Sequence, residues 1–265
     1  MRIEDIHNFF TLRQITSNPL EIIRFRKNRN IENLLKVQFL NGPPVYLRGG
    51  SRDFHLFHRI YLRDEYRLNS ILSHRLGCVL DLGANIGLFA TRVAPFVTYV
   101  IAYEPVPVNY IQLKKNTKNF LNITAVQSAV SHTEGTLRIF IPINKKSTGS
   151  FSAFFNKGKL LENDYIEVQS LLLDTIFKRH EINECDLLKI DVEGAEYEIF
   201  YAASDDTFAR IKRIHGEYHD VRPAEVQSPI MELKGFLENK GFTVQIEPHH
   251  KNPNNGLFFA RRTIN

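Results

Sequence analysis

The chain has 265 residues, of which 43% are hydrophobic and 24% are charged. This composition is typical of a folded globular protein and excludes disordered, collagen-like and coiled-coil chains. The net charge of +5 is concentrated at one end, because residues 1–77 carry 13 Lys and Arg against 7 Asp and Glu, whereas residues 78–265 carry 21 against 22. A basic segment of this kind indicates an anionic partner, such as a phosphate, a nucleic acid or a membrane surface, or simply a solvated basic helix.

Neither targeting nor metal-binding signals stand out in the sequence. The first residues lack a basic start followed by an apolar stretch, and no apolar run approaches the roughly 20 residues that a membrane-spanning helix needs. We therefore expect no membrane span and a cytoplasmic location. The two cysteines, Cys78 and Cys185, form no ligand-spaced cluster, so we expect reduced thiols rather than a disulfide framework or a zinc site.

The first 77 residues are predicted to form a basic N-terminal extension that could cap a substrate. We expect residues 1–35 to be helical and peripheral, and residues 36–49 to form two short strands around an Asn-Gly-Pro-Pro turn. Residues 64–77 are predicted to form a helix ending at Gly77, since leucine and isoleucine recur on one side. The aromatic residues between Phe54 and Tyr66 alternate with arginines, which suits packing against a sheet or stacking on sugars and bases.

From residue 78 onward, strands alternate with helices. Strands are predicted at 78–82, 99–104 and 123–130, with helices beginning near residues 86 and 107 between them, and this βαβαβ pattern is typical of a parallel sheet. The remaining strands are expected at 136–141, 165–170, 186–191, 213–219, 242–247 and 256–262, and the remaining helices at 173–180, from about 194, and at 223–241. The last two strands follow each other without a helix and must be antiparallel. The polar loop 145–159 could be a mobile lid or a simple insertion.

The most specific segment is residues 79–87, where an apolar strand ends in Asp81 and runs through a glycine-spaced turn into a helix. Gly83 and Gly87 allow close approach to the backbone. An acid here would repel a dinucleotide pyrophosphate, but it can stabilise the ammonium group of an amino-acid moiety. Glu104 ends the next strand 23 residues later, where a carboxylate accepts hydrogen bonds from ribose hydroxyls. Alone it would suit a helix cap or a solvated charge; together the two acids predict a nucleoside site.

Residues 188–196 place three carboxylates around a second strand-to-helix turn. Open α/β sheets bind ligands outside the carboxyl ends of their strands, so Asp191 and Glu193 are expected to face the same crevice as Asp81. The helix dipole offers another explanation for Glu193 and Glu196, because it favours carboxylates in the first turn.

The strand at 213–219 brings a third set of polar groups to this edge. His219 could be a general base whose imidazole is oriented by a carboxylate, and Glu217 could orient a substrate hydroxyl. A histidine that only stabilises the end of the strand is the alternative. The candidate catalytic residues are therefore Asp191, Glu217 and His219.

These four segments resemble the FkbM family of S-adenosylmethionine-dependent methyltransferases. The resemblance extends from about residue 53 to 262 and is carried by VLDLGANIGLFA, AYEPVPVNYIQLKKN, LLLDTIF, DLLKIDVEGAEYEIF and NNGLFFARR. It implies an α/β, Rossmann-like class I methyltransferase fold over residues 78–265, with a seven-stranded sheet of order 3214576 and strand 7 antiparallel. Strands 1 and 4 are neighbours in this order, so Cys78 and Cys185 are expected within about 12 Å of each other.

The resemblance also implies a cofactor, a reaction and the residues that serve them. S-adenosylmethionine would be the cofactor, and O-methylation of a hydroxyl on a sugar, glycan or natural product the reaction. The methionine part would be surrounded by Asp81, Gly83, Asn85 and Gly87, the ribose would be bound by Glu104, and the adenine would be flanked by Ser128 and Ala129. Asp191 would lie where cofactor and acceptor meet.

Other functions remain compatible with these residues. The basic N-terminal segment favours a methyltransferase that acts on nucleic acid or protein, although no Asn/Asp-Pro-Pro-Tyr-type motif follows the fourth core strand. A non-catalytic partner subunit that binds the cofactor is another alternative, and so is a nicotinamide oxidoreductase, which would need a G-x-G-x-x-G turn. Mg²⁺ held by Asp191, Glu217 and His219 is not favoured, because two carboxylates and a histidine are a weak signature. We expect a small-molecule or glycan acceptor, which could be anionic, rather than nucleic acid; the sequence does not predict an oligomeric state.

Overall fold

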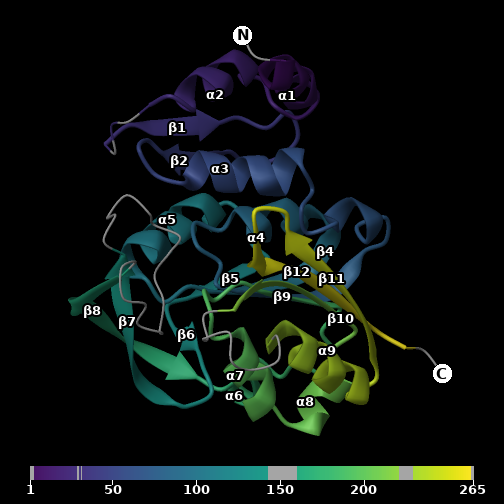
Figure 1. Cartoon of the computed structure of the whole chain (residues 1–265). Helices are drawn as coiled ribbons and strands as arrows, with labels where there is room; N and C mark the ends of the chain where they lie inside the picture. The colour runs from purple at the N-terminus through teal and green to yellow at the C-terminus, as the bar shows by residue number, and fades with distance from the viewer. Residues whose placement is uncertain (1–2, 29, 31, 143–159, 221–228, 264–265) are drawn as a thin grey trace.

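The structure is a computed structural model that describes residues 3–28, 30, 32–142, 160–220 and 229–263. Its centre is a seven-stranded sheet (Figure 1), formed by β3 (Leu76–Leu82), β4 (Val97–Tyr103), β5 (Ile123–Val126), β9 (Leu187–Ile190), β10 (Arg213–His219), β11 (Phe242–His249) and β12 (Asn252–Arg262). The order across the sheet is β11-β12-β10-β9-β3-β4-β5. Numbered along the chain, this is the predicted order 3214576 read from the other edge. The last strand, β12, is antiparallel to both of its neighbours, so the predicted Rossmann-like sheet is confirmed.

The sheet is covered on both faces, which explains why its central strands are almost continuously apolar. One face is covered by α4 (Leu88–Val93), η3 (Ala94–Phe96) and α5 (Pro107–Thr117), and the other by α6 (Leu173–Arg179), α7 (Glu196–Ala202), α8 (Asp205–Ala209) and α9 (Pro229–Asn239) (Figure 1). Successive side chains of a strand point to opposite faces. Val79 accordingly belongs to the core shared with α4, and Leu80 to the core shared with α6 and α7.

A smaller sheet of three strands has the order β6-β8-β7, with β6 (Ala129–Val130), β7 (Gly135–Pro142) and β8 (Leu160–Leu171). The predicted single strand over residues 123–130 is therefore wrong in its extent. β5 ends at Val126, and residues 129 and 130 pair with β8 instead. The Ser128 hydroxyl donates to the carbonyl of Gln169 at 3.0 Å, which ties the chain to β8 at the break. The predicted loop 145–159 lies outside the described residues.

The N-terminal extension contains the predicted helices and hairpin. Its elements are α1 (Ile3–Ile15), α2 (Pro19–Phe25), β1 (Leu34–Val37), β2 (Val45–Arg48), α3 (Asp53–Phe57) and the π-helix η1 (His58–Leu62). Their apolar side chains, including Leu12 and Phe57, join the same core as α4 and α5. The aromatic residues pack inside it, since the Phe57 and Tyr61 rings stack with centroids 5.0 Å apart. The extension is thus continuous with the layer of helices on one face of the sheet (Figure 1).

The predicted helix over residues 64–77 is wrong. The structure has the 3₁₀ turn η2 (Leu68–Ser70) and the first two residues of β3 in this segment, and no α-helix forms because Asp64 and Arg67 adopt left-handed backbone conformations with φ of 49° and 53°. The Asp64 carboxylate accepts hydrogen bonds from the N–H groups of Leu68 and Asn69. Such side-chain bonds compete with the helical hydrogen-bond pattern. Leu68 and Leu72 are nevertheless buried, so the spacing of the apolar residues correctly indicated buried side chains but did not indicate a helix.

Two smaller predictions also concern the fold. Cys78 and Cys185 are free, buried thiols. The N–H group of Asp186 donates to the carbonyl oxygen of Cys78 at 2.9 Å, so the expected proximity of the two cysteines is confirmed. Among the described residues, no helix combines the length and the apolar character needed to cross a bilayer.

Candidate active site

A cavity of about 890 Å³, partly open to solvent, lies at the carboxyl ends of β3, β4 and β9. Open α/β sheets bind their ligands at this edge. Its wall contains seven of the residues predicted from the sequence, namely Gly83, Asn85, Glu104, Ser128, Ala129, Asp191 and Glu193. Asp81 and Gly87 do not line it, and Glu217 and His219 stand beside Asp191 without lining it.

The turn between β3 and α4 forms the floor of the cavity. Gly83 has φ of 76°, and a Cβ there would stand 1.8 Å from the carbonyl oxygen of Asp191, so only glycine lets the turns after β3 and β9 touch. Asn85 is also left-handed, and its side-chain oxygen Oδ1 is buried with no hydrogen-bond partner among the described residues. Gly87 has φ of 83° and begins α4, where it packs against Leu113.

Glu104 extends from the end of β4 into the cavity wall and is only 4% exposed. Its carboxylate accepts the N–H groups of Asn85 at 2.8 Å and of Val106 at 2.9 Å. Burial outweighs these bonds and raises the pKa of Glu104 to about 7. Each oxygen of a carboxylate has two lone pairs, so Glu104 can still accept hydrogen bonds from the hydroxyl groups of a ligand.

Ser128 and Ala129 lie where the chain leaves the main sheet, and both are buried in the wall of the cavity. Val130, Leu137 and Ile139 continue this wall with apolar side chains. A flat, largely apolar group such as an aromatic base fits against such a surface.

Asp81 is fully buried and does not line the cavity. Its neighbour across the strands is Lys189 of β9, whose ammonium Nζ lies 3.1 Å from the Asp81 carboxylate. The same ammonium donates to the carbonyl oxygens of Gly83 at 2.7 Å and Leu82 at 3.3 Å. Burial raises the pKa of Asp81 above its ordinary value, although Lys189 opposes this shift. The pair therefore fixes the glycine turn, and Lys189 also lines the cavity.

Asp191 follows β9 and faces the cavity. The hydroxyl group of Tyr66 donates to its carboxylate at 3.2 Å. Burial opposes ionisation, but Lys189, His219 and Arg59 together lower the pKa of Asp191 below its ordinary value. An ionised carboxylate is thus available in the cavity wall.

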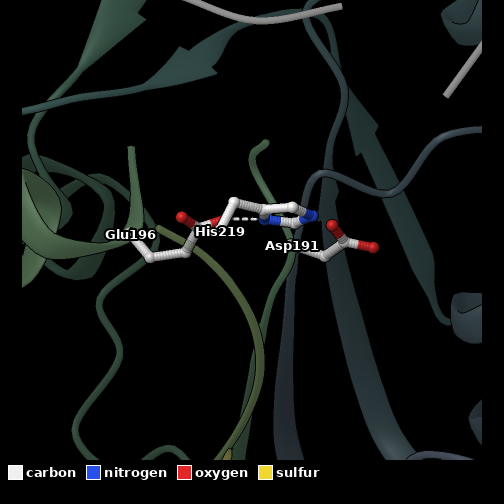
Figure 2. A group of neighbouring side chains, drawn as sticks. All are labelled: Asp191, Glu196 and His219. Carbon is white, nitrogen blue, oxygen red and sulfur yellow. Dashed lines mark hydrogen bonds and ion pairs between the residues drawn. The ribbon is translucent and has the colours of Figure 1, made fainter. Parts of the chain in front are cut away.

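His219, at the end of β10, lies between two carboxylates. Figure 2 shows its ring nitrogen Nδ1 bonded to Glu196 while the other side of the ring faces Asp191. The Nδ1 to Glu196 Oε1 distance is 3.0 Å, and Nε2 lies 3.7 Å from carboxylate oxygens of both Glu193 and Glu217. Burial alone would lower the pKa of His219, but Glu196 and the other carboxylates hold it well above its ordinary value.

The remaining charges come from the β9–α7 turn, from β10 and from the N-terminal extension. Arg59 of η1 donates to Glu217 Oε2 at 2.5 Å and also pairs with Glu65. Burial, with Asp191 and other acids nearby, raises the pKa of Glu217 above its ordinary value. Burial also raises the pKa of Glu193 to about 8. The π-helix that carries Arg59 is a rare conformation that is frequent at functional sites.

One group of side chains has the composition of a metal site. Ligand atoms of Asp191, Glu196 and His219 lie within 4.8 Å of one another. Glu196 Oε1, however, already accepts hydrogen bonds from His219 and from the N–H groups of Val192 and Gly194. The three bonds to this one oxygen favour a hydrogen-bonded network over a cation site.

Several residues of the site were not found by sequence reasoning. Lys189 is the only cation in the apolar strand β9, and a buried lysine needs a partner, so its presence was a usable signal. No sequence signal marked Arg59 and Tyr66, because their partners Glu217 and Asp191 are 158 and 125 residues away in the chain.

Comparisons with known proteins show the family of the chain. A family model described as "Methyltransferase FkbM domain" matches residues 81–244. The chain is 29% identical over 236 residues to the 31-O-demethyl-FK506 methyltransferase FkbM of Streptomyces tacrolimicus, which covers 78% of this chain and 88% of that protein. It is 25% identical over 197 residues to methyltransferase sdnD of Sordaria araneosa, with 63% and 73% covered.

A solved structure of magnesium protoporphyrin IX methyltransferase (ChlM) from Synechocystis PCC 6803 with bound SAM is 11% identical, with a TM-score of 0.43 over 80% of this chain and 83% of that one. The family model covers more than half of the chain. The chain therefore belongs to the FkbM methyltransferase family, and it is an enzyme whose methyl donor is S-adenosylmethionine.

Proposed function

We propose that the protein transfers the methyl group to a hydroxyl of a sugar, glycan or natural product. The observation that carries this proposal is the pair formed by Asp191, an ionised carboxylate in the cavity wall, and His219, whose imidazole is held beside it (Figure 2). A hydroxyl acceptor needs orientation and a base for its proton, and these residue types supply both.

The cavity fits the cofactor. The glycine turn leaves a cradle that a Cβ at Gly83 would fill, and Asn85 presents a buried oxygen without a partner among the described residues. In our proposal Gly83 and Asn85 contact the methionine part, Glu104 accepts the ribose hydroxyls, and Ser128 and Ala129 flank the adenine. Asp81 and Gly87, which the sequence also assigned to this role, do not contact the cofactor in our proposal. Asp81 supports the turn through its ion pair with Lys189, and Gly87 supports it as the N-cap of α4.

When bound, the cofactor supplies an electrophilic and positively charged methyl sulfonium group. In the proposed reaction, Asp191 accepts a hydrogen bond from the acceptor hydroxyl, and His219 Nε2 takes its proton at a pH above the raised pKa of the ring, where the imidazole is neutral. Glu217 is held by Arg59 and can orient a neighbouring hydroxyl. The carboxylates around His219 balance the positive charge of the donor, so this end of the cavity favours a neutral polyhydroxyl acceptor over an anionic one.

The N-terminal extension would complete the acceptor side of the site. Leu56, Ile60 and Tyr66 line the cavity, and Arg59 reaches Glu217. We therefore assign residues 1–77 to an acceptor-side cap that packs on residues 78–265, the part that binds the cofactor.

The test is transfer of labelled methyl from S-adenosylmethionine to a panel of sugars, oligosaccharides and polyhydroxylated natural products, with the product analysed for a methyl ether. Asp191→Asn and His219→Ala should each lower kcat by about 10²- to 10⁴-fold, the usual contribution of a general base and its partners. His250→Ala is the matched control, because that histidine is exposed.

Three results would contradict the proposal. Methyl transfer to RNA or to a protein side chain, but to no hydroxyl of the panel, would assign the enzyme to another acceptor class. Binding of S-adenosylhomocysteine without turnover on any acceptor would indicate a partner subunit without activity. Full activity of His219→Ala would remove that residue from the chemistry.

A further inference from the structure

Glu196 is a carboxylate with no exposed surface, and it does not line the cavity. It is the first residue of α7, and its oxygen Oε1 accepts three hydrogen bonds. Two come from the backbone N–H groups of Val192 and Gly194, each at 3.2 Å, and the third from Nδ1 of His219 at 3.0 Å. A buried charge is costly unless it is paired and hydrogen-bonded, so this one calls for an explanation beyond the helix dipole.

The three bonds connect two elements that are separate in the sequence. Val192 and Gly194 belong to the turn after β9, which also carries Asp191 and Glu193, whereas His219 ends β10. Glu193 and Gly194 have φ of 56° and 112°, a left-handed turn that is strained at Glu193. A single atom, Glu196 Oε1, is thus hydrogen-bonded both to the turn after β9 and to the imidazole of His219.

This contact fixes the state of the histidine. A carboxylate accepts and cannot donate when ionised, so Nδ1 must carry the proton that it shares with Glu196. In the neutral imidazole Nε2 is then a bare acceptor, and it is the nitrogen on the side of Asp191 (Figure 2). The Nε2 atom has Glu193 and Glu217 at 3.7 Å, beyond hydrogen-bond distance.

We propose that Glu196 is the positioning residue of the transfer reaction: it selects the Nδ1–H form of His219, aims Nε2 at the acceptor hydroxyl beside Asp191, and stabilises the imidazolium formed when Nε2 takes the proton. This inference rests on the proposed function, in which His219 is the base. The same division of labour, with a buried carboxylate behind a histidine base, recurs on unrelated folds.

Other charged groups also act on His219. The described groups that face it from the packed elements are Glu196 on α7, Asp191 and Glu193 in the turn after β9, and Glu217 on β10, with Arg59 of η1 behind Glu217 and Asp220 next in the chain bonded to Tyr197. All of the carboxylates favour the protonated ring, but among them only Glu196 is hydrogen-bonded to it in the described structure. Removing the Glu196 charge should therefore lower the pKa of His219.

Three variants distinguish the effect of the Glu196 charge from that of its hydrogen bond with His219. In Glu196→Gln, the N–H groups of Val192 and Gly194 keep the amide oxygen at the Oε1 position, so the bond from Nδ1 survives and only the charge is lost. Glu196→Ala removes the bond as well. Glu198→Gln is the matched control, since it neutralises a glutamate two residues along the same helix, whereas the carboxylates within 4.0 Å of His219 in the described structure are Glu193, Glu196 and Glu217.

The experiment measures kcat, KM and the pH profile of kcat/KM for the full chain. We expect Glu196→Ala to lose as much kcat as His219→Ala, about 10²- to 10⁴-fold, with KM for the cofactor changed little. Glu196→Gln should have an intermediate kcat, and the acid limb of its profile should move to lower pH by ~1–3 units, the effect of one close charge. Glu198→Gln should match the wild type.

A spectroscopic readout covers the case in which Glu196→Ala does not fold. Imidazole ¹⁵N shifts of His219 in the wild-type protein, assigned by comparison with His219→Ala, should show the Nδ1–H form once the ring is neutral. The opposite tautomer would overturn the inference, and so would Glu196 variants with wild-type kcat and an unmoved acid limb while His219→Ala is impaired. If His219→Ala itself keeps full activity, the proposed function fails, and the role of Glu196 fails with it.

Discussion

The Asp81–Lys189 pair gives the sharpest test of how the glycine turn is supported. Lys189 is 4% exposed and Asp81 is fully buried, so Lys189→Met would leave a buried carboxylate without its cation. Breaking a buried pair by removing one partner costs about 3–5 kcal/mol. At about 2–4 °C per kcal/mol for a chain of this size, the unfolding midpoint should fall by about 6–20 °C. The loss includes the bonds from Lys189 to the carbonyls of Gly83 and Leu82.

The effect should depend on pH in a defined direction. Burial already raises the pKa of Asp81, and loss of Lys189 raises it further. A carboxyl group whose folded-state pKa exceeds its unfolded value costs stability above the unfolded pKa, about 3.9 for Asp, and this cost increases until the folded-state pKa is reached. Lys189→Met should therefore be closest to the wild type in acid and most destabilised at neutral pH.

Urea unfolding followed by far-ultraviolet circular dichroism suits this chain, which contains no tryptophan. Lys240→Met is the matched control, because Lys240 pairs with Asp205, whose side chain is 84% exposed, and should lose less than about 1 kcal/mol. The double variant Asp81→Leu/Lys189→Met should recover at least ~2 kcal/mol of the single-variant loss. Equal midpoints for Lys189→Met and Lys240→Met, or purely additive losses in the double variant, would refute this reasoning.

Three further predictions concern the cavity. Gly83→Ala should abolish S-adenosylhomocysteine binding in calorimetry, since its Cβ would stand 1.8 Å from a carbonyl oxygen, whereas Gly235→Ala, with nothing within 4 Å, should bind normally and gain about 0.5–1 kcal/mol of stability. The pKa of Glu104, about 7, lies above its ordinary 4.5, so this group costs stability as pH rises between these values, while ligand affinity should rise with pH as the carboxylate forms. Glu104→Gln should remove the pH dependence of stability and that of ligand affinity between these values. If both pH dependences stay unchanged in the variant, the role given to Glu104 is contradicted. Tyr66→Phe removes one hydrogen bond to Asp191 and should lower kcat/KM by about 2- to 10-fold, so a wild-type value would mean that the contact is dispensable.

The sequence by itself determined the strand directions of the main sheet, whereas the order of its strands was implied by the resemblance to the FkbM family. Apolar strands alternating with helices require a parallel sheet, and the last two strands, which follow each other without a helix between them, must be antiparallel. It also placed Gly83, Glu104 and Asp191 at the ends of three strands, where the structure has them lining one cavity. These features depend on the spacing of apolar residues and on the residues that end each strand, and both are local properties of the chain.

Tertiary structure decided what local pattern could not. The segment 64–77 differs from its prediction for a local reason: its leucines have the spacing of a helix, but the Asp64 carboxylate accepts the N–H groups of Leu68 and Asn69, and the segment becomes a turn. Contacts between distant residues decided the rest. Strand register puts Lys189 beside Asp81. Packing of the extension brings Tyr66 to Asp191, and the β9–α7 turn brings Glu196 to His219. Each of these pairs joins residues far apart in the chain, so its energy depends on a geometry that exists only after the sheet and its two layers have formed.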